Sequence, residues 1–94
     1  MPSQQTSDVS LETRRRRILF RSWHRGTREM DLILSRFADA EIAGLCESEL
    51  DDYERLLEAP DRDVFSWVTG EAETPSLYDT TVLRKIRAFH SKQF

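Results

Sequence analysis

The sequence predicts an all-α fold, a compact single-domain five-helix bundle. Every periodic stretch of apolar residues follows helical spacing, and none alternates apolar and polar side chains as a half-buried strand does. The three glycines each follow such a stretch, where they mark helix ends. The length of 94 residues is that of one domain, and 38% hydrophobic residues suffice for one modest core.

The first two helices are expected on either side of Gly26. The first covers residues 11–24, and its apolar residues near helical spacing are Leu11, Ile18, Leu19 and Trp23. The second is predicted to begin after Thr27, whose hydroxyl suits an N-cap, and to end at Gly44. Its apolar residues follow the pattern of one buried face: Met30, Ile33, Leu34, Phe37, Ala38 and Ile42.

The third and fourth helices are separated by Pro60. The third covers Glu47–Glu58, with Cys46 at the N-cap position, and ends there because the residue before a proline disfavours helical geometry. The fourth is expected to be capped by Asp61 and to end at Gly70. The apolar residues assigned to the core are Leu50, Tyr53, Leu56 and Leu57 from the third helix and Val64, Phe65, Trp67 and Val68 from the fourth.

The last helix is predicted to begin at Thr74-Pro75, since threonine suits the N-cap and proline the first helical position. It is expected to bury Leu77, Val82, Ile86 and Phe89, with Leu83 at the margin. The helical domain then covers residues 13–92. Residues 1–12 are rich in polar side chains and are expected to form a disordered tail.

The composition argues against an enzyme and against a metal site. Cys46, His24 and His90 do not have the spacing of metal ligands or of a catalytic pair, and no glycine-rich phosphate loop is present. The single cysteine cannot form an internal disulfide. No apolar run reaches the roughly 20 residues of a membrane span, and the first residues lack the apolar stretch of a secretory signal. A cytoplasmic binding protein without a stably bound cofactor is therefore expected.

Charge is strongly segregated behind a net value of −3. Residues 13–28 hold seven arginines and no acid, whereas residues 39–79 hold thirteen acids and only two arginines. A basic patch on an acidic body suits a specific acidic partner. One alternative stays open, a small helical nucleic-acid-binding regulator in which Arg14–Arg17 neutralise phosphates and Trp23 stacks on a base. The net negative charge argues against it.

The segment from Arg25 to Glu29 differs from an ordinary interhelical turn. Gly26 allows the backbone to turn sharply, or allows another surface to approach where a Cβ would collide. Arg25 and Glu29 then place a bidentate donor and an acceptor on either side of this bare backbone. The residues by themselves favour the plainer interpretation, an ordinary helix break at which Arg25 and Glu29 form a weak surface ion pair.

Two blocks of sequence resemble the FAD assembly factors of succinate dehydrogenase, that is, bacterial SdhE and its mitochondrial counterpart, succinate dehydrogenase assembly factor 2. The first block is the R-G-x-x-E motif, formed by Arg25, Gly26 and Glu29, with Asp31 two residues later. The second is residues 56–67, Leu-Leu-Glu-Ala-Pro-Asp-Arg-Asp-Val-Phe-Ser-Trp. The likeness covers about residues 14–90 and is greater to the alphaproteobacterial and mitochondrial branch.

The resemblance implies a five-helix monomer that binds the flavoprotein subunit of succinate dehydrogenase, with that of fumarate reductase as a further client. It implies that the chain promotes covalent attachment of FAD, the partner's cofactor, to a histidine of the partner. The compartment is then the bacterial cytoplasm, or the mitochondrial matrix of a eukaryote. The residues expected to contact the partner are Arg25, Gly26 and Glu29, with Arg28 and Asp31 as second candidates and Trp23 and His24 at the rim.

Overall fold

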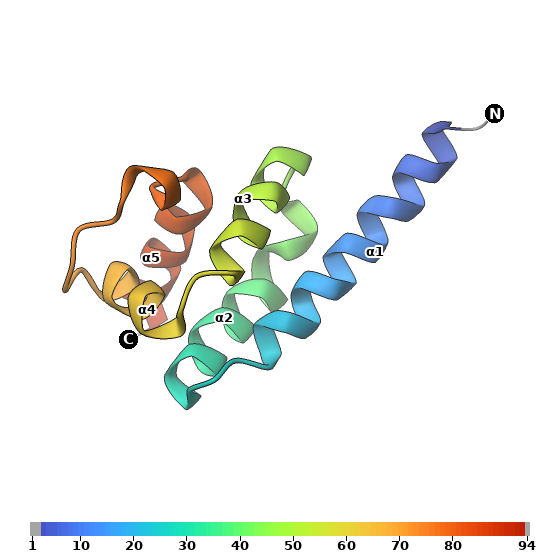
Figure 1. Cartoon of the computed structure of the whole chain (residues 1–94). Coiled ribbons are helices and arrows are strands. Elements are labelled where there is room, and N and C mark those ends of the chain that lie inside the picture. The colour runs from blue at the N-terminus through green and yellow to red at the C-terminus, as the bar shows by residue number, and fades with distance from the viewer. Residues whose placement is uncertain (1–2, 94) are drawn as a thin grey trace.

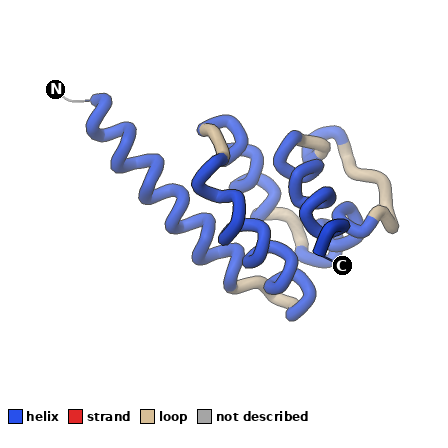
Figure 2. The backbone as a smooth tube through the Cα atoms, turned by 180° about the vertical axis from the view of Figure 1, so that it is seen from behind, coloured by secondary structure: helices blue, strands red, loops and turns tan. Residues whose placement is uncertain are grey.

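The computed structural model describes the backbone of residues 3–93 and the side chains of residues 11–92. Within residues 3–93 it contains five α-helices, two short 3-10 helices and no strand, which confirms the all-α prediction (Figures 1 and 2). The elements in chain order are α1 (Ser3–Trp23), α2 (Arg28–Glu41), η1 (Ile42–Gly44), α3 (Glu47–Leu57), α4 (Asp61–Thr69), η2 (Ser76–Tyr78) and α5 (Thr81–Gln93).

The helices are arranged around α2 and α3, which lie at the centre of the bundle. The C-terminal half of α1 packs on one side of this pair, and α4 and α5 pack on the other (Figure 1). The N-terminal part of α1 projects away from the bundle (Figure 1). The connection between α4 and α5 is the longest stretch drawn as loop, whereas α1 and α2 are joined by a short turn (Figure 2).

The first helix begins at Ser3, earlier than the start near residue 11 that the apolar spacing predicts. The expected disordered tail is therefore helical in its backbone from Ser3 onward. No proline or glycine lies between Ser3 and Trp23, so no residue type interrupts the helix there. The division into a tail of residues 1–12 and a domain of residues 13–92 stays a prediction.

The core agrees closely with the apolar pattern. All of the apolar residues predicted to be buried in α2 and α3 are buried. The Phe37 ring packs against both Tyr53 and Phe89, with 5.8 Å between ring centroids in each case. Trp67 is buried as predicted, but Phe65 is only partly buried, because its side chain lies at the surface between α2 and α4 and lines a hollow there.

Three helix ends form as their residues predict. The Thr27 hydroxyl accepts a hydrogen bond from the Met30 N–H at 3.2 Å and caps α2. Cys46 occupies the N-cap of α3, where the Glu49 carboxylate accepts from the Cys46 N–H at 2.9 Å. Gly70 ends α4 in the left-handed region at φ +85°, a conformation that glycine adopts without steric cost.

The start of the last helix was predicted wrongly. α5 begins at Thr81, where the Thr80 hydroxyl accepts from the Leu83 N–H at 3.3 Å, and not at Pro75. Residues after Pro75 instead form the separate turn η2. As a result Leu77 is 57% exposed, although it was expected in the core, and Leu83 is fully buried, although it was expected at the margin.

Candidate functional site

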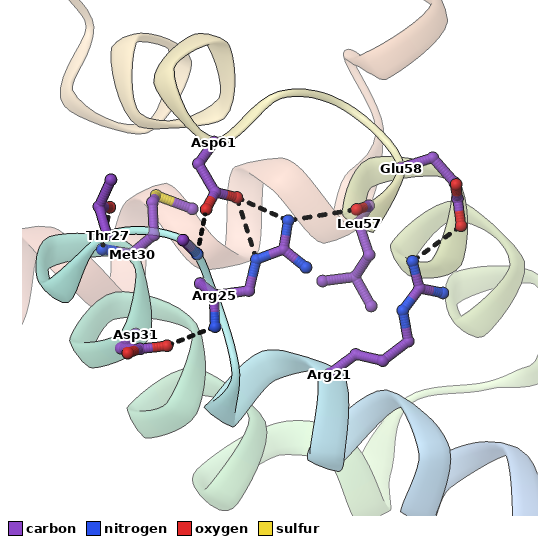
Figure 3. A network of polar contacts seen from close by, with 9 residues as sticks. Arg21, Arg25, Thr27, Met30, Asp31, Leu57, Glu58 and Asp61 are labelled. Carbon is purple, nitrogen blue, oxygen red and sulfur yellow. Dashed lines mark hydrogen bonds and ion pairs between the residues drawn. The ribbon is translucent and has the colours of Figure 1, made fainter.

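The turn between α1 and α2 is held by a carboxylate from α4 (Figure 3). Asp61 is the first residue of α4, and the N-cap position that the sequence assigns to it is occupied by Pro60. One oxygen of Asp61, Oδ1, accepts from Arg25 Nε at 3.0 Å and from Arg25 Nη2 at 2.6 Å. The other oxygen, Oδ2, accepts from the Gly26 N–H at 2.6 Å. The Asp61 side chain therefore fastens the turn to the fourth helix.

Arg25 points into the protein and away from solvent. The side chains of Arg25 and Asp61 are only 12% and 14% exposed, and Arg25 Nη2 also donates to the Leu57 carbonyl at 3.2 Å. The expected surface ion pair between Arg25 and Glu29 is not formed. Because its Nε and Nη2 donors bond to Asp61 and the Leu57 carbonyl, the Arg25 side chain links the turn to the end of α3 and the start of α4.

A second carboxylate holds the same turn from the opposite side. Asp31, in the first turn of α2, accepts from the Arg25 N–H through Oδ1 at 2.5 Å (Figure 3). The backbone N–H groups of Arg25 and Gly26 thus both donate to aspartate side chains. Hydrogen bonds to charged acceptors are stronger than those between neutral groups, so these two bonds restrain the backbone of the turn.

Gly26 lies close to Asp61, so a side chain at this position would crowd the Asp61 carboxylate. A Cβ placed on Gly26 would lie 3.1 Å from Asp61 Oδ2, which is tighter than ordinary van der Waals contact. Gly26 does not have a positive φ, so the turn conformation itself is open to other residues. The sequence indicates a close approach at this glycine, and the structure identifies the approaching group as a side chain of the same chain. Contact between Gly26 and a partner stays a prediction.

The outer surface of the turn remains exposed. Gly26, Arg28 and Glu29 are exposed, and neither Arg28 nor Glu29 has a polar partner among the residues that the structure describes. Trp23 is 50% exposed, and its indole N–H donates to Asp39 at 3.0 Å. His24 is exposed and stacks on Phe20, with 4.0 Å between ring centroids, at the end of α1.

Glu29 lies between two adjoining hollows in the surface. One, of about 290 Å³, is lined by Thr27, Glu29, Asp61, Arg62 and Phe65. The other, of about 230 Å³, is lined by Glu29, Leu32, Ile33, Phe65 and His90. Glu29 and Phe65 therefore line both hollows. A carboxylate without a partner beside apolar side chains is suited to binding a cationic or N–H group of another molecule.

Two residues of this site, Asp61 and Phe65, are missed by sequence reasoning, which assigns Asp61 to a helix cap and Phe65 to the core. The available signal is the second sequence block, which contains both residues. Neither its spacing nor its composition indicates that it lies beside the first block.

The arginines of α1 pair with the acidic face of α3. Arg14 contacts Asp51 at 2.5 Å and Glu54 at 2.9 Å, and these hydrogen bonds, that to Glu54 first, raise the pKa of the Arg14 guanidinium. Arg21 contacts Glu58 at 2.7 Å. Much of the basic run thereby serves helix packing, and nothing in the structure supports the nucleic-acid alternative.

The described residues include neither a group of metal ligands nor a helix suited to cross a membrane. No group of three or more His, Cys, Asp or Glu side chains is placed to hold a metal ion within the part of the chain that the structure describes. In that same part, none of the helices has both the length and the apolar character needed to cross a membrane.

Comparison with known proteins shows a match over most of the chain. The sequence model of a protein family described as "Flavinator of succinate dehydrogenase" matches residues 16–90. The chain is 42% identical over 77 residues to the mitochondrial succinate dehydrogenase assembly factor 2 of Dictyostelium discoideum, covering 82% of this chain and 55% of that protein. It is 38% identical over 80 residues to the FAD assembly factor SdhE of Acetobacter pasteurianus, covering 85% and 73%. The match thus spans about half the length of the first of these relatives.

Proposed function

Because this chain belongs to the family of succinate dehydrogenase flavinators, we propose that it binds the flavoprotein subunit of succinate dehydrogenase and promotes the covalent attachment of FAD to that subunit. The observation that supports this most directly is a preorganised surface. The turn of the R-G-x-x-E motif is held from opposite sides by Asp61 and Asp31, while Gly26 and Glu29 are exposed.

In this proposal the chain acts by binding and orienting its partner. A surface that is already rigid before binding loses little conformational entropy when the complex forms. It can therefore hold the flavoprotein in a geometry in which the reacting groups of the partner lie close together. Covalent attachment then links FAD to a histidine that the partner supplies, and this chain acts as an assembly factor without a catalytic group of its own.

FAD is assigned to the partner because the two hollows beside the motif residue Glu29 are small. The two beside Glu29 measure about 290 and 230 Å³, below or at the lower limit of about 300 Å³ for ordinary ligand pockets. Their linings also lack a glycine-rich loop that could approach a pyrophosphate. These features favour a protein-binding surface over a cofactor site.

We assign the residues different tasks at the interface. Glu29 accepts a hydrogen bond from a cationic or N–H group of the flavoprotein, and Gly26 lets the partner approach the backbone. Arg28 adds a second charge at the edge of the contact, and Trp23 and His24 lie at the rim. Arg25 and Asp31 were expected to contact the partner. Because both form hydrogen bonds within the chain, we propose instead that they hold the turn from within.

A co-expression experiment tests the proposal. The flavoprotein subunit is produced with wild-type chain, with Glu29→Ala, or with no assembly factor, and covalent flavin is read as fluorescence of its band in a denaturing gel. Glu71→Ala is the matched control, since Glu71 is an exposed glutamate on the loop after α4. We expect strong fluorescence with wild type and Glu71→Ala and weak fluorescence with Glu29→Ala. Equal fluorescence with and without wild type would contradict the proposed function, whereas wild-type fluorescence with Glu29→Ala would remove Glu29 from the site.

The oligomeric state, a second client and the working compartment are further parts of the proposal, and they rest on the same family membership. We propose that the chain works as a monomer, that the flavoprotein of fumarate reductase is a second client, and that the working compartment is the one in which the flavoprotein matures. This is the cytoplasm of a bacterium or the mitochondrial matrix of a eukaryote. Size-exclusion chromatography of the chain alone and with either flavoprotein tests the first two points.

A further inference from the structure

We infer that Asp61 is a positioning residue for partner binding, which acts through the Arg25–Gly26 turn and does not contact the partner through its charge. The inference rests on the proposed function and adds to the R-G-x-x-E motif a residue that lies outside it, 35 positions from Gly26. Three observations support it: the way Asp61 shares its two oxygens, the lack of backbone hydrogen bonds from the N–H groups of Arg25 and Gly26, and the position of Asp61 relative to Glu29.

The first observation is that both oxygens of Asp61 are engaged within the chain. Oδ1 accepts two bonds from Arg25, and Oδ2 accepts the Gly26 N–H. The Asp61 side chain is only 14% exposed. A carboxylate in this state has little remaining capacity to bind a partner directly, so its effect on a partner must pass through the groups that it holds.

The second observation concerns how the turn is held. The N–H groups of Arg25 and Gly26 donate to aspartate side chains, and neither donates to a backbone carbonyl. Secondary structure therefore does not define these two residues. Without Asp61 the Gly26 N–H and much of the Arg25 guanidinium would lose their acceptor, and the turn would be free to take other conformations.

The third observation links Asp61 to the outward surface. Asp61 and Glu29 line the same hollow, together with Thr27, which caps the helix that carries Glu29. A change in the turn therefore alters the edge of the surface on which Glu29 lies. The other ion pair near the end of α1, between Arg21 and Glu58, has no hydrogen bond to Arg25 or Gly26 among the described contacts, and the Glu58 side chain is 71% exposed.

The test compares four variants in calorimetric titrations with the purified flavoprotein subunit: Asp61→Asn, Glu29→Gln, the double variant, and Glu58→Gln as matched control. The control also neutralises a carboxylate that holds an arginine of the α1 end. We expect Asp61→Asn to raise the Kd by about tenfold or more and Glu58→Gln to change it by less than about twofold. Circular dichroism must show that all variants are folded at the titration temperature.

The double variant distinguishes two explanations for weaker binding by Asp61→Asn: a displaced binding surface and a smaller fraction of folded protein. If Asp61 acts by presenting the surface that includes Glu29, the two substitutions should weaken binding by less than the product of their separate effects. In nuclear magnetic resonance spectra, Asp61→Asn should also shift the Gly26 amide proton, while Glu58→Gln should not.

Each outcome bears on a different statement. Failure of the wild type to bind the flavoprotein contradicts the proposed function. Wild-type affinity of Asp61→Asn, or a double variant that equals the product of the single effects, contradicts the positioning role while leaving the proposed function intact. Should Asp61→Asn not fold, Arg25→Lys replaces it, because lysine keeps the charge but cannot reproduce the planar donor arrangement toward Asp61 and Leu57. The same less-than-product effect with Glu29→Gln is then expected, and the full product would contradict the inference.

Discussion

Replacing Gly26 by alanine should cost little stability, and the structure explains the magnitude. The new Cβ would lie 3.1 Å from Asp61 Oδ2, so the carboxylate must move away by a few tenths of an ångström. The hydrogen bond from the Gly26 N–H, now 2.6 Å, would lengthen toward about 3 Å, which is still within the ordinary range. Weakening such a charged bond costs about 1 kcal/mol. The reduced entropy of the unfolded chain offsets about 0.4–1 kcal/mol of that cost.

The net free energy of unfolding should therefore fall by no more than about 0.6 kcal/mol, which corresponds to a decrease in Tm of about 2–5 °C at most. Gly26→Arg introduces the same Cβ, and Gly26 is exposed, so the rest of the side chain can extend into solvent. Its stability should match that of Gly26→Ala within about 0.5 kcal/mol. Its binding to the flavoprotein should be lost, because a long cationic side chain would stand where the partner approaches.

The assay is a thermal melt followed by circular dichroism, together with calorimetric titration of both variants against the flavoprotein. If Gly26→Arg were unfolded while Gly26→Ala was folded, the bulk at this position would clash within the chain, and the interface role of Gly26 would be wrong. If Gly26→Arg bound the flavoprotein as tightly as Gly26→Ala, the reasoning would also fail.

Two further predictions concern the scaffold. The buried Ser22 hydroxyl donates to the Ile18 carbonyl and accepts from the buried Tyr53 hydroxyl at 2.7 Å, so Ser22→Ala should lower the free energy of unfolding by about 1–3 kcal/mol in a urea titration. A loss of less than about 0.5 kcal/mol would show that water satisfies Tyr53 instead. The hydrogen bond from Lys85, followed by that from the Cys46 N–H, lowers the pKa of Glu49 below 4.5. The stability that the Glu49–Lys85 pair adds is present above that pH and is lost as the pH falls through the lowered pKa. Glu49→Gln should therefore flatten the decrease in Tm measured across this acidic range. An unchanged profile of Tm against pH would contradict the contribution of Glu49.

The elements that could be predicted are those whose signal is local. The apolar spacing of α2 and the threonine before it define the buried face and the start of this helix without information from elsewhere in the chain. The start of α5 could not be predicted in this way, since Thr74 and Thr80 both suit an N-cap. Which threonine caps the helix depends on a tertiary contact. Tyr78 stacks on Trp67, with 4.9 Å between ring centroids, and this holds residues Ser76–Tyr78 in the separate turn η2.

The partner of Arg25 was beyond prediction for a related reason. Residues four positions apart face each other only within one helix. Thr27 caps α2, so Glu29 lies inside the helix whereas Arg25 lies before it. Arg25 therefore bonds to Asp61, 36 positions later in the chain, and the spacing of nearby residues cannot predict a contact over that separation.

The two tryptophans lie in different environments and should differ in fluorescence emission. Trp67 is 7% exposed and stacked on an aromatic ring, whereas Trp23 is 50% exposed and lies directly before the turn that carries the motif. Indole emission moves to longer wavelength as contact with water increases. A partner that covers Trp23 would therefore shift the long-wavelength emission toward the blue, and unfolding would shift the emission of Trp67 toward the red. Intrinsic fluorescence can thus distinguish docking from denaturation without any added label.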